Sequence, residues 1–198
     1  MYKYGAKFVG ADISENQIAY AKKLSDGMDI QYIVSSAEDL DFEDNSFDVV
    51  TACQCFMYFN KSIILPKIHS LLKANGHFVI LFMAWLPYES EIAARSEELI
   101  KKYNPEWSGG GMMRYELQTP KWLDNLFKVE NAITYDIDVP FTREIWNGRM
   151  KACRGIGASS LTTKDKALWE AEHLEYLETM PEIFNIPHYV TILDLKKI

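Results

Sequence analysis

Between residues 7 and 85 the chain alternates short apolar runs with segments of helical periodicity. Four runs have the length of strands, and their near-continuous apolar character is typical of strands covered on both faces. They are residues 7–12, 30–35, 47–54 and 76–84. Helices are expected after Ser14, which has a capping-box partner in Gln17, and at residues 60–73, where Pro66 indicates a kink or a late start. This order predicts an open parallel sheet with helices on both faces.

After residue 85 the pattern is less regular. Helices are expected at residues 89–103, 120–127, 142–155 and 163–179, and strands at residues 129–141 and 188–195. Periodicity does not decide whether these last two strands are parallel or antiparallel, and we predict an antiparallel pair. The glycine-containing segment of residues 104–120 has the length of a mobile cover over a site.

Composition narrows the class of protein. With 198 residues, 48% of them hydrophobic and 25% charged, the chain can bury the core of one globular domain. A net charge of −7, with basic clusters no longer than a pair of lysines, argues against a nucleic-acid partner. No stretch reaches the roughly 18 apolar residues that span a bilayer, so a membrane partner is not expected.

The cysteines carry a separate argument about metals and compartment. Cys53, Cys55 and Cys153 cannot all pair, and no CxxC motif or cluster of His and Cys offers a metal cage. We therefore expect no metal site. A reducing cytoplasm fits this use of cysteine best.

An acid follows the first apolar run directly. Asp12 would lie at the carboxyl end of a parallel strand, which is the edge where open α/β sheets bind ligands, and its two oxygens can accept both hydroxyls of a ribose. Taken alone, Asp12 fits equally well as a helix-start acid favoured by the helix dipole.

Three segments, in this order and spacing, resemble successive motifs of the class I S-adenosylmethionine-dependent methyltransferases. They are "FVGADISENQIAYAKK", "SSAEDLDFEDNSFDVVTACQCFMYF" and "LLKANGHFVILF", and the resemblance covers about residues 4–85. It is to the small-molecule branch, with ubiquinone/menaquinone-type and trans-aconitate-type enzymes. It implies a Rossmann-like sheet, S-adenosylmethionine as cofactor and a small-molecule methyl acceptor. A single domain of residues 1–198 is expected, with 1–85 binding the cofactor and 86–198 forming the acceptor side and lid.

The resemblance assigns cofactor contacts position by position. The implied cofactor-binding residues are Asp12, Ile13, Ser36, Ala37, Glu38, Cys53 and Gln54. Asp12 would hold the ribose and Ile13 would lie against the adenine. The backbone N–H of Ala37, with polar side chains on either side of it, would read the edge of the ring. Ser36 departs from the aspartate that is often found in the family, so its bond to the exocyclic amine is the least supported of these contacts.

Structural alternatives stand beside three of these assignments. Glu38 could only start an acidic turn, Cys53 could be plain core, and Gln54 could satisfy local backbone. For Asp12 the agreement of the adjoining motifs favours the ribose contact over the helix-start alternative.

One family motif has no counterpart in this sequence. A glycine-rich loop usually precedes the acid by about 20 residues. The residues before Asp12 contain Gly5 and Gly10 but no G-x-G-x-G, so we expect the first strand and its loop to be missing from this chain. Such a chain would bind S-adenosylmethionine weakly or not at all and transfer no methyl group by itself. Whether the native gene product contains the motif is left open.

The acceptor side is less well defined. Catalytic residues are unknown, because the sulfonium already activates the methyl group and no acid–base pair is needed. Candidate substrate contacts are Tyr58, Trp85, Arg114, Trp146 and Arg149, with Trp107, Tyr115, Arg154 and His188 as further candidates. Arg149 and Arg154 could clamp an acceptor carboxylate. Equally, Trp146 could pack the C-terminal part while the arginines pair with its acids.

Two classes of function follow. The first is a methyltransferase acting on a small molecule, impaired in this short form. The second is a non-catalytic remnant or a partner-dependent subunit, whose sheet another chain would complete. A nucleotide-sugar or NAD-binding fold is weaker, because the "AEDL…FD" spacing is that of the methyltransferases. Apolar surface left uncovered would favour self-association, so a homodimer is also considered.

Overall fold

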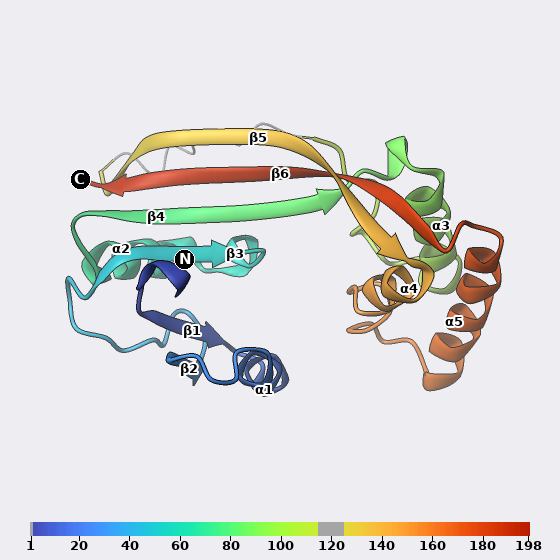
Figure 1. Ribbon diagram of the computed structural model, residues 1–198, viewed down its shortest axis with the longest axis horizontal. Helices are drawn as coiled ribbons and strands as arrows, with labels where there is room; N and C mark the ends of the chain where they lie inside the picture. Colours follow the sequence, from blue (N-terminus) through green and yellow to red (C-terminus); the bar gives the residue numbers. More distant parts are fainter. Residues whose placement is uncertain (1, 115–124) are drawn as a thin grey trace. The chain divides into compact units, whose positions relative to one another are not determined.

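The computed structural model describes residues 2–114 and 125–198 (Figure 1). The strands are β1 (Phe8–Asp12), β2 (Ile30–Val34), β3 (Phe47–Cys53), β4 (Leu72–Trp85), β5 (Phe127–Thr142) and β6 (Ile183–Lys197). The helices are α1 (Glu15–Leu24), α2 (Lys61–Leu71), α3 (Glu91–Tyr103), α4 (Arg143–Lys151) and α5 (Thr163–Glu178). Short 3₁₀ turns are η1 (Tyr2–Tyr4), η2 (Phe56–Tyr58) and η3 (Pro87–Glu89). No helix within these described ranges is long and apolar enough to cross a membrane.

The chain divides into two compact units. The first unit comprises Met1–Ile80, Thr119–Glu130 and Asp194–Ile198, and the second comprises Leu81–Gln118 and Asn131–Leu193. Strands β4, β5 and β6 each contribute residues to both units.

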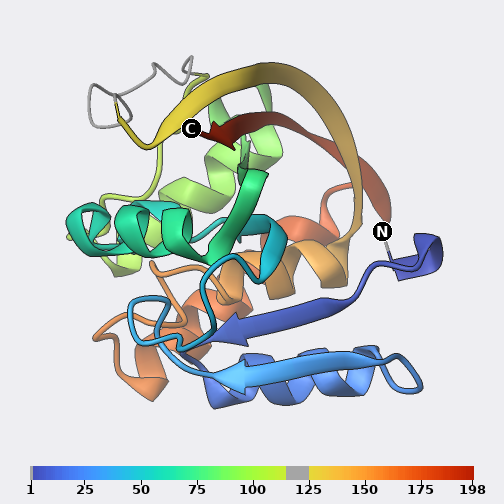
Figure 2. The ribbon, with the colours of Figure 1, turned by 90° about the vertical axis from the view of Figure 1, so that its left-hand side faces the viewer.

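The strands form two sheets. β1 pairs in parallel with β2, in a register that runs from Phe8 opposite Ile30 to Asp12 opposite Val34. Figure 2 shows α1 lying along this pair. The second sheet has the order β3-β4-β6-β5.

β6 reverses direction relative to its neighbours. Contacts along it are His77–Asp194 and Leu86–Pro187 toward β4, and Leu126–Ile198 and Thr134–Thr191 toward β5. In both series the residue number rises on one strand as it falls on the other, so β6 is antiparallel to β4 and to β5. The predicted fold class, an α/β sheet with an antiparallel C-terminal strand pair, is confirmed.

No strand ladder joins β1 to β3 within the described residues. Each of these two strands has a hydrogen-bonded neighbour on one side, β2 for β1 and β4 for β3. The backbone groups on their other edges are not paired in a ladder, which is the arrangement that leaves a sheet edge open to another strand.

Several predicted boundaries are wrong. The helix expected at residues 60–73 ends at Leu71, and β4 already begins at Leu72, whose side chain is fully buried. Asn75, in the left-handed region at φ 63°, therefore lies inside a strand and does not end a helix. Pro66 lies in the helix interior, so it does not mark a late start. α4 ends at Lys151, short of the expected 155.

The helix expected at residues 120–127 falls largely outside the described residues. Residues 115–124 are not described, and Phe127 opens β5. β5 and β6 both extend beyond the predicted strands at each end.

Helices α3, α4 and α5 enclose the core of the second unit (Figure 1). Trp146 and Trp169 are completely buried there, and Trp146 packs edge-on against Trp85 with 5.9 Å between ring centroids. Edge-to-face aromatic contacts add to the burial of apolar area. This unit therefore has an aromatic core of its own.

Candidate functional site

Asp12 ends β1 with its side chain exposed. Its main-chain oxygen accepts from Ser35 N at 3.0 Å, which holds it beside the segment that leaves β2. Its Oδ1 accepts from Ser14 N at 2.8 Å. One carboxylate oxygen thus supports the start of α1, as in the helix-start alternative, and the other is left for a ligand. Ile13, next in sequence, is 75% exposed, so its side chain is accessible to a ligand.

The turn of residues 36–38 follows β2. Ser36 Oγ accepts from Asp39 N at 3.1 Å and lies 2.6 Å from Asp39 Oδ2, so its hydroxyl serves the turn itself. Glu38 Oε1 accepts from Asn60 N at 2.9 Å, at the start of α2. Within the described residues the backbone N–H of Ala37 donates no hydrogen bond. The Ala37 N–H is therefore a donor that this turn can offer to a ligand.

Lys67, from the middle of α2, clamps the backbone of the same turn. Its Nζ donates to the main-chain oxygens of Glu38 and of Leu40, the latter at 2.7 Å. Sequence reasoning missed this residue. A lysine on a helix that is separated from the turn by more than 20 residues gives no local signal of the contact.

The end of β3 supplies the third part of the site. Cys53 is exposed, so the alternative that it is plain core is wrong. Gln54 has φ 60°, in the left-handed region, which turns the chain sharply after the strand. Burial raises the pKa of the Cys55 thiol, and electrostatic interaction with Cys53 and Asp12 raises it further. Asp12 and residues 53–55 are therefore close enough to interact electrostatically.

These interactions connect the predicted cofactor residues of the first unit to one another. Asp12 bonds to the residue before the 36–38 turn, the turn bonds to the start of α2, and the charge of Asp12 reaches the 53–55 segment. Tyr58, a predicted substrate contact, is 59% exposed in η2 of the same unit.

The predicted substrate residues of the second unit have different environments. Trp146 is fully buried and donates from Nε1 to Ser96 Oγ at 2.9 Å, which matches the packing alternative. Trp85 is 9% exposed and donates from Nε1 to Glu97 Oε1 at 2.7 Å. Neither indole N–H is available to a ligand.

The two arginines also differ. Arg114 donates to both carboxylate oxygens of Glu89 and, at 2.8 Å each, to both of Asp136. These hydrogen bonds raise the pKa of Arg114 and lower the pKa values of Glu89 and Asp136. Arg149 instead lies over the ring of Trp85, 4.9 Å from its centroid. Arg149 is therefore the better candidate for an anionic ligand, because its charge is not neutralised by a described ion pair.

The further candidates are less informative. Trp107 packs on the core of the second unit, and Gly111 N donates to Glu97 Oε2 at 2.7 Å, so this part of the expected cover is anchored. His188 is buried, donates from Nδ1 to Ile186 O, and has its pKa lowered by burial. Tyr115 lies outside the described residues.

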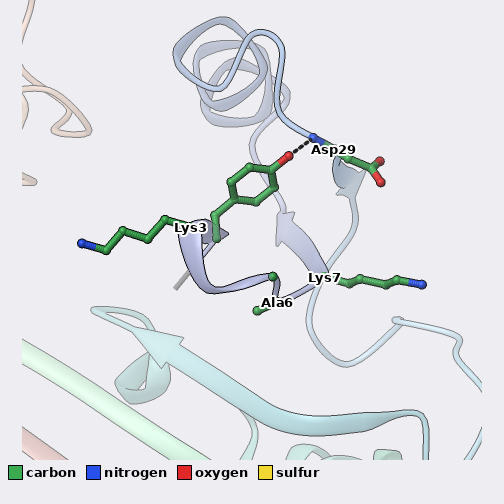
Figure 3. Close-up of a pocket in the computed structure, with 6 residues that line it drawn as sticks. Lys3, Ala6, Lys7 and Asp29 are labelled. Atoms are coloured by element: carbon green, nitrogen blue, oxygen red, sulfur yellow. Dashed lines mark hydrogen bonds between the residues drawn. The ribbon is translucent and has the colours of Figure 1, made fainter.

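A cavity of about 400 Å³ opens beside η1 in the first unit (Figure 3). Asp29 N donates to Tyr2 Oη at 2.8 Å across it. Lys3 and Lys7 line it but extend in opposite directions, so their charges do not converge on one ligand. Among the residues described, no three His, Cys, Asp or Glu side chains gather where they could hold a metal ion.

Comparison with known proteins bears on this arrangement. Residues 1–80 match the family model described as "Methyltransferase domain". A presumed methyltransferase of Dictyostelium discoideum is 32% identical over 78 residues, which are 39% of this chain and 28% of that protein. The chain thus matches less than a third of that relative's length.

Solved structures show the same fold. A presumed type II methyltransferase from Anaeromyxobacter dehalogenans has a TM-score of 0.57 at 16% identity, covering 96% of this chain and 79% of that one. A presumed methyltransferase from Bacillus halodurans has a TM-score of 0.52 at 16% identity, covering 96% and 83%. The chain has the fold of these methyltransferase structures, and the predicted Rossmann-like fold is confirmed.

Proposed function

We propose that the first unit binds S-adenosylmethionine at the edge formed by Asp12, residues 36–38 and residues 53–54, and that the chain serves methyl transfer to a small molecule. The observation that carries the proposal is the joint placement of an exposed carboxylate and an unused backbone N–H on neighbouring parallel strands. Ligands of open α/β sheets bind at this carboxyl edge.

The side chains present fit the cofactor. Asp12 would accept ribose hydroxyls through the oxygen that Ser14 does not use, and the exposed Ile13 would cover one face of the adenine. Ala37 N–H would donate to a ring nitrogen. Cys53 and Gln54, at the end of β3, would face the methionine part. Glu38 would hold the start of α2 through Oε1, which accepts from Asn60 N.

The cofactor, when bound, supplies a methyl group that its sulfonium has already activated. The work left to the chain is to hold the cofactor, align the acceptor and exclude water. The proposed site offers donors and acceptors for binding, which this work requires.

For the acceptor we propose a small molecule with an anionic group. In the second unit Arg149, stacked on Trp85, would bind a carboxylate. Arg114 and Trp146 would contribute indirectly, through the ion pairs and core packing described above. A cytoplasmic location completes the proposal, since the three cysteines are free.

A second candidate is a subunit that depends on a partner. It is favoured by the sheet edges of β1 and β3, which are not joined to each other. A strand from another polypeptide segment could pair with both. For the same reason we propose that this chain alone binds the cofactor weakly and shows no methyl transfer, because an unpaired edge leaves the site open to water.

The test is a titration with S-adenosylmethionine followed by NMR, which detects affinities down to the millimolar range. Asp12→Asn should weaken binding about ten- to a hundredfold, since a charged acceptor of hydroxyl groups contributes roughly 1.5–3 kcal/mol. Asp26→Asn, a change at an exposed acid in the turn after α1, is the matched control and should leave binding unchanged.

Two outcomes would contradict the proposal. Equal affinities of wild type and Asp12→Asn would remove Asp12 from the site. Micromolar binding by a monomer would contradict weak binding by the chain alone, and light scattering on the same sample gives the oligomeric state.

A further inference from the structure

Helix α2 is tied to the loop after β2 at three places. Asn60, the N-cap of the helix, donates from its backbone N–H to Glu38. In the middle of the helix Lys67 donates to the main-chain oxygens of residues 38 and 40. In the last turn Ser70 O accepts from Asn45 N at 2.9 Å. All these residues belong to the first unit. The loop that carries the Ala37 N–H is thus held from outside by one helix.

Lys67 makes the strongest of these ties. It is half-buried, and its ammonium group donates to two main-chain oxygens that flank residue 39. Hydrogen bonds from a charged donor are roughly twice as strong as those between neutral groups. No carboxylate within the described residues forms an ion pair with Lys67, so its charge acts on the turn alone.

The position of the Ala37 N–H depends on this clamp. Residues 37–39 form a turn whose own hydrogen bonds are those of Ser36 with Asp39, on the solvent side. A turn of this kind without an external tie can adopt other conformations, which would move the N–H by more than a binding site tolerates. The two hydrogen bonds from Lys67 of α2 restrict the turn to one of these conformations.

We propose that Lys67 is a positioning residue for the cofactor site, which fixes the 36–38 turn so that the Ala37 N–H meets a ring nitrogen of adenine. The inference rests on the proposed function and deepens it. Because the Ala37 group is a hydrogen-bond donor, the site should prefer a purine whose ring carries an acceptor nitrogen, and not a donor, at the edge that faces it. Adenosine presents such an acceptor at N1, whereas inosine carries an N–H there.

The experiment compares wild type with Lys67→Met, which keeps the apolar stem, and with Lys67→Arg, which restores a charged donor. Lys23→Met, at an exposed lysine in the last turn of α1, is the matched control. Adenosine and inosine are the probes, titrated by NMR, and amide hydrogen exchange of residues 35–41 is measured without ligand.

Lys67→Met should raise exchange in residues 35–41 and weaken adenosine binding by up to about tenfold, the loss expected when the one hydrogen bond from the Ala37 N–H is no longer aligned. It should also reduce the preference for adenosine over inosine, which a merely structural role would not change. Lys67→Arg should restore most of that preference, and Lys23→Met should behave as wild type.

The failures are distinguishable. If wild type binds neither S-adenosylmethionine nor adenosine, the proposed function fails and the inference fails with it. If wild type prefers adenosine and Lys67→Met keeps both the affinity and the preference, the inference alone is overturned. Unchanged hydrogen exchange of residues 35–41 in Lys67→Met would also contradict the proposal that Lys67 holds the turn in place.

Discussion

His173 should make the second unit sensitive to mild acid. Its ring is fully buried on α5, with Nδ1 2.8 Å from Asn147 Oδ1 and Nε2 2.9 Å from Ser96 Oγ. The same Ser96 oxygen accepts from Trp146 Nε1. Burial lowers the pKa of His173 from 6.5 to about 4. Burial therefore favours the neutral form of the imidazole.

The sign and size of the effect follow from that pKa. A histidine whose pKa is lower in the folded state binds its proton more readily when unfolded, so its stabilising contribution is complete above pH 6.5 and is lost as the pH falls toward 4. Between pH 7 and pH 5 the free energy of unfolding should fall by about 2 kcal/mol through this group. Nearby, Glu170 lies 3.4 Å from Asn147 Nδ2 but is itself paired with Lys151.

The assay is urea unfolding between pH 5 and pH 7, followed by tryptophan fluorescence, since the buried Trp146 and Trp169 report on this unit. His173→Gln removes the titration while keeping polar atoms in the network. The measured quantity is the slope of the unfolding free energy against pH, which is independent of any uniform loss of stability in the variant. His69→Gln, at a part-exposed ring of the first unit, is the control.

We expect a clearly shallower slope in His173→Gln and the wild-type slope in His69→Gln. The reasoning is refuted if His173→Gln keeps the full pH dependence between pH 5 and 6.5, because the proton uptake would then belong to other groups.

Two further predictions concern packing and thiol chemistry. Gly155→Ala should lower the free energy of unfolding by about 1–3 kcal/mol, because the added Cβ would lie 2.5 Å from Ile100 Cγ2; Gly148→Ala, inside α4 with nothing within 4 Å, should instead raise it by up to about 1 kcal/mol. Equal effects of the two changes in urea unfolding would contradict the packing argument. The exposed Cys53 should react first with an aromatic disulfide reagent, ahead of Cys55, whose pKa burial raises. If the fast phase of the reaction with the reagent persists in Cys53→Ser, another cysteine reacts first and the prediction is wrong.

The sequence by itself determined the local elements and their order. Ser14 accepts from Gln17 N at the start of α1, as the capping box predicts, and the four apolar runs before residue 85 all became strands. These signals work because they depend on a few neighbouring residues whose backbone groups must be satisfied within one turn or one strand. The order of motifs also indicated the class of the fold.

Where the sequence misplaced a boundary, packing had overruled a local signal. Asn75 and Gly76 predicted the end of a helix, but the burial of Leu72 extends β4 through them. A turn signal contributes about 1 kcal/mol, which is less than the roughly 1.5–3 kcal/mol gained by burying a leucine side chain.

Only the tertiary structure decided which side chains are available to a ligand. Arg114 and Arg149 are equivalent candidates in the sequence, yet the fold places the first between two carboxylates and the second over Trp85. Lys67 reaches the turn of the cofactor site across 29 positions of the chain, and Trp146 reaches Ser96 across 50. Contacts at such separations carry no periodic signal, because they form only when distant segments pack together and each buried polar group must find a partner there.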